Sequence, residues 1–541
     1  MQSLPYSRMS GFPKLFVDYV EDYGRVEEFF NGRPANSKSW LQQFTHIDSG
    51  EYHREKLIDI LSNHNGESGS RRILAKQLKK FEDPRSAVVI TGQQAGIFWG
   101  PLYTVYKAIS AIRFAEYLEK TYNRPVIPLF WLEVDDHDFN EVRQFHLMLP
   151  TGEIRKFQYS DDETDKPLPV KNRKISVHFS TLLEELASEF GSAVNAGKTI
   201  AEIQIIYRPG RDFADVFIRF FRKYFPKLPL LFINPGDDAV KQLAKPFFRR
   251  VIAKSDAIEE ALESQTELLV NKKYQPQVAV RSGILHLFHV VNNERARLNI
   301  NNVFKEKGKS SADRDSQIAA FVEKEAESLS PDVLLRPLLQ DFLLPTVAYV
   351  GGPSEISYFA QLKKVYSLFD IPMPLIVPRW SGTVIDKKTL SFLKKILFDP
   401  CELLTNDAKD ILPQMVEKAT GKRFDAQFEK THLQLQSRLN EIRKLGGTLD
   451  STLVSMVDKS ELKMKYQLNK MQARFQKALQ AANRIAEERS KRAMNMIIPE
   501  NRLQERTFSI LNYLFRYGRN FTRFLSHVIT TETDKHHIIE Y

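Results

Sequence analysis

The chain has 541 residues, a formal net charge of +11, 42% hydrophobic residues and 27% charged residues. This length predicts roughly two to four domains, and the composition excludes the disordered, collagen-like and membrane classes. No apolar run reaches the ~18 residues of a membrane span, and the N-terminal residues lack the pattern of a signal peptide. The single cysteine, Cys401, can form neither an intrachain disulfide nor a CxxC zinc site, so we expect a cytoplasmic protein.

Buried strands alternate with helices in the first part of the chain. Residues 54–82 predict a polar helix, and the apolar runs at 87–91 and 126–132 are typical of buried parallel strands. Residues 102–122 between them carry apolar side chains at helical spacing. Together they predict a βαβ unit and an α/β fold with a Rossmann-like core.

The same pattern returns at residues 344–350, which lead into a glycine turn, a helix to about residue 369 and a strand at 374–377. Between the two parts, residues 145–152 predict a hairpin, 230–234 a strand and 277–291 further strands. We expect these middle elements to be insertions between core units.

A heptad pattern marks the region after residue 385. Met464, Leu468, Met471, Phe475, Ala478, Ala482 and Ile485 are spaced alternately four and three residues apart. An earlier helix carries Phe428, Leu435 and Ile442, and Gly446-Gly447 is expected to end it. The two helices predict an antiparallel coiled-coil hairpin, followed by one amphipathic helix at 503–525.

Residues 463–492 contain nine Lys or Arg and two acids, Glu487 and Glu488. A basic helix can bind nucleic acid, but no aromatic platform accompanies this one, so we interpret it as a solvated helix face. The expected domains are a first core part at 1–142, insertions at 143–330, a second core part at 331–384, the coiled-coil arm at 385–498 and a returning helix at 499–541.

The first candidate site follows the strand at 87–91. Its glycines allow a ligand to approach the backbone, and the N-terminus of the next helix can bind an anion that Lys107 could also reach. The spacing is not that of a Walker A motif, and a tight turn with ordinary helix packing is the alternative. The candidate binding residues are Thr91, Gly92, Gln93, Gln94, Gly96, Gly100, Pro101 and Tyr103.

The second candidate site consists of Trp131, a candidate binding residue, and the acidic run that follows it. His137 is our candidate general base, since histidine ionises near neutral pH, and Asp136 and Asp138 flank it. The carboxylates could instead bind a hard cation such as Mg²⁺. A solvated loop is the alternative without function.

The third candidate site lies around the strand at 344–350. Tyr349, Gly351, Gly352, Glu355 and Tyr358 form a glycine turn entering a helix, with Arg336 and Gln340 upstream and Arg379 after the next strand. Arginine can hold a carboxylate through two hydrogen bonds, although a surface ion pair is the commoner role for a single arginine. All three candidate sites follow core strands, where open α/β sheets bind ligands.

These runs resemble the BshC family of bacillithiol biosynthesis. The resemblance rests on ITGQQAGIFWGPLYTVYKA, FWLEVDDHDFNEV, LLRPLLQDFLLPTVAYVGGPSEISYFAQLKKVY and IPMPLIVPR, with LPYSRMSGFPKLFVDYV before and NRLQERTFSILNYL after them. They occur in the family's order from about residue 4 to 525. The family usually shows Glu-Asp-His-Asp where this chain has Asp135-Asp136-His137-Asp138.

The resemblance implies a ligase that joins cysteine to the amine of glucosaminyl-malate and so forms bacillithiol. It also implies a core similar to class I aminoacyl-tRNA synthetases, nucleotide binding and a homodimer paired through the coiled coil. We expect ATP to activate the cysteine carboxylate, with Mg²⁺ as an optional companion, and expect His137, Asp136, Asp138 and Lys107 to be catalytic. No specific nucleic acid or membrane partner is expected.

Two other classes of function stay open at this point. One is a nucleotidyl-transferring enzyme with a synthetase-like core that acts on tRNA or another small molecule. The other is a coiled-coil scaffold whose core has no catalytic role.

Overall fold

The chain folds into two units, and the second interrupts the first in sequence. The computed structural model describes residues 2–66, 71–281, 283–291, 294–304, 311–420 and 425–541. The first unit comprises residues 1–383 and 502–539, and the second comprises 384–501 and 540–541.

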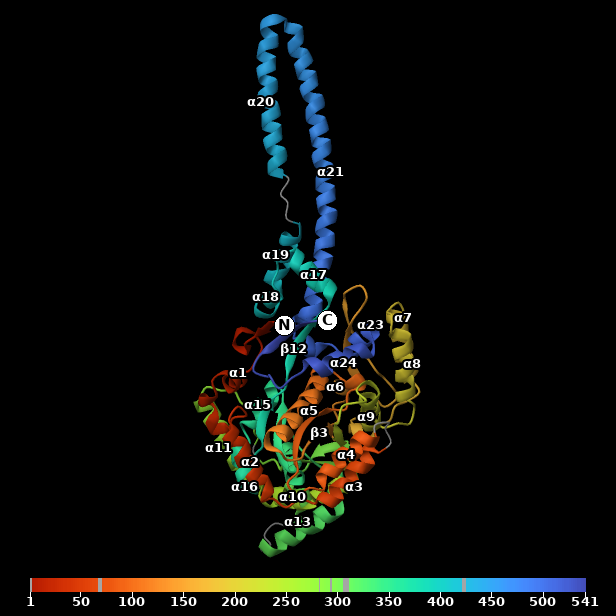
Figure 1. Ribbon diagram of the computed structural model, residues 1–541, viewed down its shortest axis with the longest axis vertical. Coiled ribbons are helices and arrows are strands. Elements are labelled where there is room, and N and C mark those ends of the chain that lie inside the picture. The colour runs from red at the N-terminus through yellow and green to blue at the C-terminus, as the bar shows by residue number, and fades with distance from the viewer. Residues whose placement is uncertain (1, 67–70, 282, 292–293, 305–310, 421–424) are drawn as a thin grey trace. The chain divides into compact units, whose positions relative to one another are not determined.

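A parallel sheet forms the centre of the first unit (Figure 1). Its strands are β2 (Ala87–Gln94), β3 (Val126–Glu133), β6 (Leu231–Ile233), β10 (Thr346–Gly351) and β11 (Leu375–Pro378). Their order is β6-β3-β2-β10-β11, and neighbouring strands pair in parallel. The chain moves outward from β2 to β6 and then continues with β10 on the other side of β2. This is a Rossmann-like order, and its switch point lies between β2 and β10.

Both faces of the sheet are buried, which explains the continuous apolar runs of its strands. Along β2, Val88 and Ile90 belong to one hydrophobic cluster, whereas Ala87 and Val89 belong to another. The second cluster includes side chains of α2 (Ser37–Asp48) and α5 (Tyr103–Tyr122), so these helices cover that face.

The predicted core helices are largely confirmed. Helix α5 and strands β2, β3, β6, β10 and β11 lie where expected. The helix expected at 54–82 is seen as α3 (Arg54–Asn65) and α4 (Arg71–Phe81), and residues 67–70 of that prediction lie outside the described part. The helix expected up to residue 369 is divided into α15 (Pro353–Phe359) and α16 (Lys363–Phe369). Gln361, between them, is buried and bonds both backbone groups of Val278.

The predicted hairpin is confirmed as β4 (Gln144–Met148) and β5 (Ile154–Gln158). The expectation of strands across 277–291 is wrong for its first half. Among the described residues of this range, only β7 (Leu287–Val291) forms a strand, and it pairs with β8 (Glu294–Arg297) and β9 (Leu329–Pro331). Gly283 and His286 have positive φ angles, which interrupt an extended chain before β7.

The other helices of this unit, in chain order, are α1 (Lys14–Glu21), α6 (Phe139–Arg143), α7 (Phe179–Phe190), α8 (Ala196–Ile206), α9 (Phe213–Tyr224), α10 (Asp238–Ala253), α11 (Ser255–Asn271), α12 (Ile300–Val303), α13 (Ser311–Glu325) and α14 (Arg336–Leu343).

The single helix expected at 503–525 is wrong. The segment forms α22 (Gln504–Thr507), α23 (Leu511–Tyr517) and α24 (Arg519–Val528), because Phe508 is extended and Gly518 has a φ of 57°. The strand that follows, β13 (His536–Glu540), was not predicted. It pairs with β1 (Gln2–Leu4) in a sheet that also contains β12 (Ser381–Ile385).

The second unit contains the predicted helical hairpin, formed by α20 (Asp425–Leu449) and α21 (Ser451–Ile497) (Figure 1). The rings of Phe428 and Phe475 meet across it at 5.4 Å. Contrary to expectation, α20 continues through Gly446-Gly447, and the turn comes at Asp450, whose carboxylate caps α21. Three further helices complete the unit: α17 (Lys387–Lys395), α18 (Pro400–Thr405) and α19 (Ala408–Thr420).

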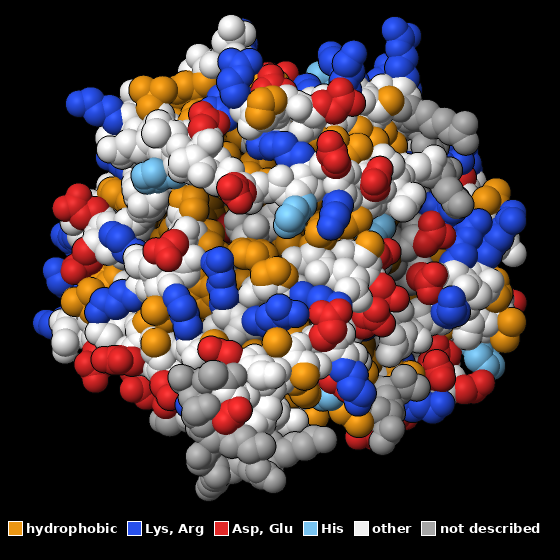
Figure 2. All heavy atoms as spheres, turned by 90° about the horizontal axis from the view of Figure 1, so that it is seen from below, with side chains coloured by type: hydrophobic (Ala, Val, Ile, Leu, Met, Phe, Trp, Pro, Cys, Tyr) orange, Lys and Arg blue, Asp and Glu red, His pale blue; other side chains and the backbone are white. Residues whose placement is uncertain are grey.

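Charges of both signs cover the protein surface. On the face shown in Figure 2, acidic and basic side chains are interspersed wherever the structure describes them. In the described residues, no helix is both long and apolar enough to cross a bilayer.

The segment between β2 and α5 is held by aromatic packing. Phe98, Trp99 and Gly100 all have positive φ angles, which cost energy for residues other than glycine. The Trp99 ring stacks on Phe217 and Phe221 at centroid distances of 4.3 and 4.7 Å, and its indole N–H donates to the Phe217 carbonyl.

We therefore expect Trp99→Ala to lower the free energy of unfolding by about 3–5 kcal/mol, the usual range for removing a buried tryptophan. The measurement is urea unfolding followed by circular dichroism. Trp99→Phe, which keeps an aromatic ring but loses the indole hydrogen bond, should cost less. An alanine variant as stable as wild type would contradict this account of the segment.

Candidate active site

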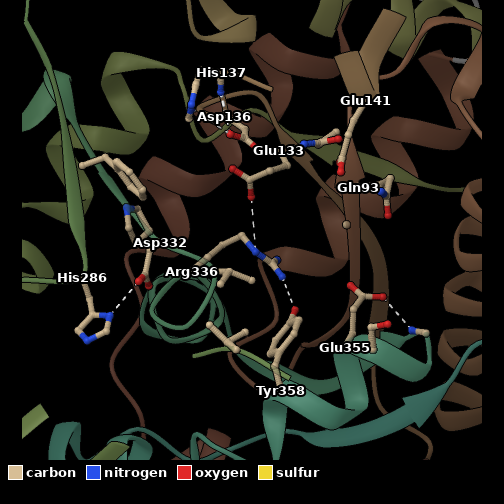
Figure 3. Close-up of a pocket in the computed structure, with 18 of the residues that line it drawn as sticks. Gln93, Glu133, Asp136, His137, Glu141, His286, Asp332, Arg336, Glu355 and Tyr358 are labelled. Carbon is tan, nitrogen blue, oxygen red and sulfur yellow. Dashed lines mark hydrogen bonds and ion pairs between the residues drawn. The ribbon is translucent and has the colours of Figure 1, made fainter. Parts of the chain in front are cut away.

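A cavity of about 550 Å³ opens at the carboxyl ends of β2, β3 and β10 (Figure 3). This is the switch point of the sheet, where ligands bind in open α/β folds. The cavity wall combines residues of all three predicted sites with a further wall from β7, β8 and the segment before α14.

Many predicted residues line this cavity: Gly92, Gln93, Gln94, Tyr103, Lys107, Asp136, His137, Arg336, Gly352, Glu355, Tyr358 and Arg379. Others lie behind the wall or away from it: Thr91, Gly96, Gly100, Pro101, Trp131, Asp138, Gln340, Tyr349 and Gly351. The three predicted sites therefore form one site. Fewer of the predicted residues line its cavity than the sequence suggested.

Lys107 occupies the junction of the first and third predicted sites. Its ammonium lies 2.5 Å from a Glu355 carboxylate oxygen and donates to the Gly92 carbonyl and the Gln93 side chain. Burial alone would raise the pKa of Glu355, but Lys107 and the Gly352 N–H hold it below its usual value. Lys107 is therefore paired with Glu355 and also lines the cavity, and its expected contact with an anionic ligand stays a prediction.

The glycine segment also differs from its prediction. The N–H of Leu102, at the start of α5, donates to the Phe508 carbonyl, and Gly96, Gly100 and Pro101 are absent from the cavity wall. The Leu102 N–H is therefore already occupied, and the anion site expected at this helix N-terminus stays a prediction. Gly92 is needed for close strand packing, since a Cβ there would meet the Trp131 carbonyl at 2.9 Å.

The acidic run divides into structural and cavity-facing residues. Asp135 is buried between Lys241 and Lys171, at 2.6 and 3.1 Å, and their charges hold its pKa at about 2 against the opposing effect of burial. Asp138 caps α6 by accepting from Asn140 and Glu141 N–H groups. Asp138 thus has a structural role in capping α6, and its expected catalytic role stays a prediction.

Asp136 and His137 face the cavity. Asp136 accepts hydrogen bonds from the Gln94 amide at 2.8 Å and from Arg295 at 3.2 Å. His137 is 45% exposed, and its Nδ1 lies 3.4 Å from Asp136 and 3.5 Å from Arg295. Because Asp136 can only accept and Arg295 only donate, the ring can hold its proton on either nitrogen. The role of His137 as general base stays a prediction.

Glu133, at the end of β3, was missed by the sequence analysis. It lies between Asp136 and Arg336 in Figure 3, with 24% of its side chain exposed. Its Oε2 lies 3.5 Å from the Arg336 Nε and has no hydrogen-bond partner. Burial raises the pKa of this carboxyl to about 7, opposed by Arg336 and reinforced by Asp135. Such a group can exchange a proton near neutral pH.

The arginines of the third predicted site are held by the protein. Arg336 donates to the Tyr358 hydroxyl at 2.5 Å. Arg379 does hold a carboxylate, but it is that of Glu505, at 2.6 Å in a fully buried contact. Glu505 also accepts from the Ser381 hydroxyl and the Gly382 N–H. This network holds Arg379 in the cavity wall, and its expected contact with a substrate carboxylate stays a prediction.

The sequence analysis also missed the residues that form the remaining wall of the cavity. His286 and Asp332 are hydrogen-bonded at 2.8 Å, and Arg295 and Arg297 project from β8 near Phe288. The one sequence signal was the spacing of two residues between these arginines, which puts both on one face of a strand. His286 and Asp332 stand alone in the sequence and gave no signal.

Three lining arginines, Arg281, Arg297 and Arg506, are exposed. Within the described part of the chain, they have no side-chain hydrogen bond or ion pair, so their charges are available to a ligand. No group of three or more His, Cys, Asp or Glu side chains among the described residues is arranged to hold a metal ion.

The fold and the cavity together define a Rossmann-like α/β protein with a switch-point ligand site and a separate coiled-coil domain. Residues 1–380 match the family model described as "Bacillithiol biosynthesis BshC, N-terminal Rossmann-like domain". Residues 382–541 match the model described as "Bacillithiol biosynthesis BshC, C-terminal coiled-coil domain". The chain therefore belongs to the BshC family.

Relatives match over nearly the full length of the chain. One from Salinibacter ruber, named "Putative cysteine ligase BshC", is 31% identical over 99% of this chain and 97% of its own length. Proteins of the same name from Geobacillus thermodenitrificans and Koribacter versatilis are 27% and 28% identical, over 97% and 95% of this chain and the same shares of their own lengths.

The buried Lys107–Glu355 pair makes a stability prediction. Lys107→Met leaves the Glu355 carboxylate buried without its cation, so we expect the free energy of unfolding to fall by about 3–5 kcal/mol. The double variant Lys107→Met/Glu355→Gln removes both charges and should recover much of this loss. Urea unfolding of the three proteins measures both effects. A single variant that unfolds like wild type would show that the pair contributes little to stability.

Proposed function

We propose that this chain joins the carboxyl group of cysteine to the amine of glucosaminyl-malate, forming the amide bond of bacillithiol. One observation carries the proposal: the runs that resemble the family meet at a single cavity at the switch point of the sheet. The name of the relatives, "Putative cysteine ligase BshC", and the description of the family models as bacillithiol biosynthesis support the same reaction.

The chemistry requires an activated carboxyl group, because a carboxylate is a poor electrophile at neutral pH. We propose that ATP supplies the activation, through an acyl-adenylate or an acyl-phosphate. Mg²⁺ would accompany the nucleotide, since it binds through phosphate oxygens and one or two carboxylates. The use of ATP assigns the reaction to the cytoplasm.

The charge of the cavity suits these substrates. Malate carboxylates and nucleotide phosphates are anions, and Arg281, Arg297 and Arg506 offer unpaired guanidinium groups on the wall. Guanidinium groups bind carboxylates and phosphates through paired hydrogen bonds. The thiol of the product comes from the substrate, because no cysteine is among the lining residues.

The reaction is tested with purified chain, cysteine, glucosaminyl-malate and ATP, followed by mass spectrometry. We expect bacillithiol to form with consumption of one ATP per product, and AMP or ADP as the by-product tells an adenylate from an acyl-phosphate. Cells that lack the protein should lose bacillithiol and accumulate glucosaminyl-malate. Normal bacillithiol in such cells would contradict the proposal, and product formation that requires tRNA would favour a tRNA-dependent reaction.

We also propose that the arm pairs two copies of the chain. Leu468, predicted to lie on the pairing face, is only 8% exposed and packs within the hairpin. Leu462 and Tyr466, four residues apart on α21, are instead 70% and 62% exposed. Apolar side chains in such exposed helical positions favour burial against a partner helix. The basic residues of α21 include the i,i+4 ion pairs Lys465–Glu461 and Lys491–Glu487, as expected for a solvated face.

Leu462→Asp/Tyr466→Asp should therefore convert dimers into monomers in analytical ultracentrifugation. Helix content should remain near wild type by circular dichroism, because both side chains lie outside the hairpin core. Lys463→Asp, which also adds acidic charge to an exposed site on the same helix, is the control and should leave the dimer intact. A double variant that sediments like wild type would rule out pairing through this surface.

A further inference from the structure

The cavity contains a carboxyl group that none of the predicted roles uses. Glu133 ends β3 one residue beyond the fully buried Leu132, so the strand itself directs its side chain to the mouth of the sheet. Figure 3 shows it between the groups of the acidic run and those of α14 and α15. A substrate bound at the switch point would therefore contact the Glu133 carboxyl group.

The surroundings of Glu133 leave its carboxyl available. Asp135 is fixed by two lysines, Asp136 by Gln94 and Arg295, and Glu355 by Lys107. The Oε2 of Glu133 has only the 3.5 Å contact with Arg336 and no hydrogen bond. A buried oxygen without a donor keeps its capacity to accept a proton or a hydrogen bond.

The charged groups around Glu133 act in opposite directions. Arg336 on α14 and Arg295 on β8 lower its pKa, whereas Asp135 and Asp136 after β3 raise it. The charge of Glu133 also acts on Lys241 of α10 and Tyr358 of α15 and raises the pKa of both groups. With burial as the largest effect, the pKa lies at about 7 instead of 4.5.

We propose that Glu133 is the catalytic base that takes the proton from the attacking amine. The inference rests on the proposed function. The amine nitrogen forms a bond to the carbonyl carbon of the activated cysteine, and one N–H proton passes to a Glu133 oxygen. The bond from that carbon to the phosphate or adenylate oxygen breaks, and the leaving group departs with the electron pair. ATP is the co-reactant that supplies the leaving group.

The first test is the pH profile of kcat/KM with the amine substrate. A base with a pKa near 7 is active when ionised, so wild-type activity should rise with pH through about 7. Glu133→Gln should reduce kcat roughly 10²–10⁴-fold and abolish this limb. Any limb from the substrate's own amine is common to all variants and serves as an internal reference.

Glu141→Gln and His137→Asn are the matched controls. Glu141 lines the same cavity, and burial raises its pKa as well. Both control variants should keep the limb that Glu133→Gln loses. If the limb disappears in His137→Asn and persists in Glu133→Gln, His137 is the base and the proposal is overturned.

A second readout is independent of turnover. Because the pKa of Glu133 is raised on folding, its contribution to stability is fully present below pH 4.5 and is lost as the pH rises through about 7. Glutamine mimics the protonated form at every pH. The melting temperature of Glu133→Gln should therefore match wild type near pH 4, below the unfolded pKa, and exceed it at pH 8.

If the glutamine variant folds poorly, Glu133→Ala can be assayed instead, with and without formate. Formate is a small carboxylate that can replace the missing side-chain base. Formate should restore part of its activity and none of the activity of Glu141→Ala. A Glu133→Gln enzyme that is active and has an unchanged pH profile would overturn the role of Glu133 as the base, but not the proposed reaction. A wild-type chain that forms no product would overturn the proposed reaction, and the assignment with it.

Discussion

The ion pair between Lys107 and Glu355 is the interaction on which the cavity depends. It joins α5, which follows β2, to α15, which follows β10, across the switch point of the sheet. The same ammonium bonds the Gly92 carbonyl, and the same carboxylate accepts from Tyr349 and Gly352. Two βα units that are far apart in sequence thus share one buried charge pair, which sets the spacing of the cavity floor.

Several charged side chains in the cavity wall already have an oppositely charged protein partner. Lys107, Arg379, Asp136 and Glu355 are each held by a protein partner, which costs flexibility but fixes geometry. Preorganised groups need no rearrangement when a ligand binds. Glu133, whose Oε2 has no hydrogen bond, and the three exposed arginines are the groups to which we assign the proposed chemistry and the proposed attraction for anions.

The sequence predicted the sheet well because burial on both faces leaves a direct record in apolar runs such as 87–91 and 126–132. It also identified most of the cavity floor, since the carboxyl ends of adjacent parallel strands must meet. It could not identify His286 or Asp332, because their positions depend on the packing of an insertion against the core. Nor could it show that Lys107 is neutralised, because its partner is 248 positions away in the chain.

The same limit applies to single residues within the recognised runs. Asp135, Asp136, His137 and Asp138 are adjacent in sequence, yet only the middle two line the cavity. Asp135 turns to Lys241 on α10, and Asp138 turns back to cap its own helix. The local sequence does not reveal the direction of each carboxylate, because that direction depends on contacts with the surrounding helices.

The discontinuity of the first unit affects how the protein is made. Glu505, which forms an ion pair with Arg379, follows it by 126 residues, and residues 384–501 of the second unit are synthesised between them. At ribosomal rates of about 5–20 residues per second, this interval lasts roughly 6–25 s. During that time the arm, whose contacts are local, can fold while the core still lacks α22 and β13. A chain interrupted in the arm would therefore leave Arg379 without its carboxylate partner.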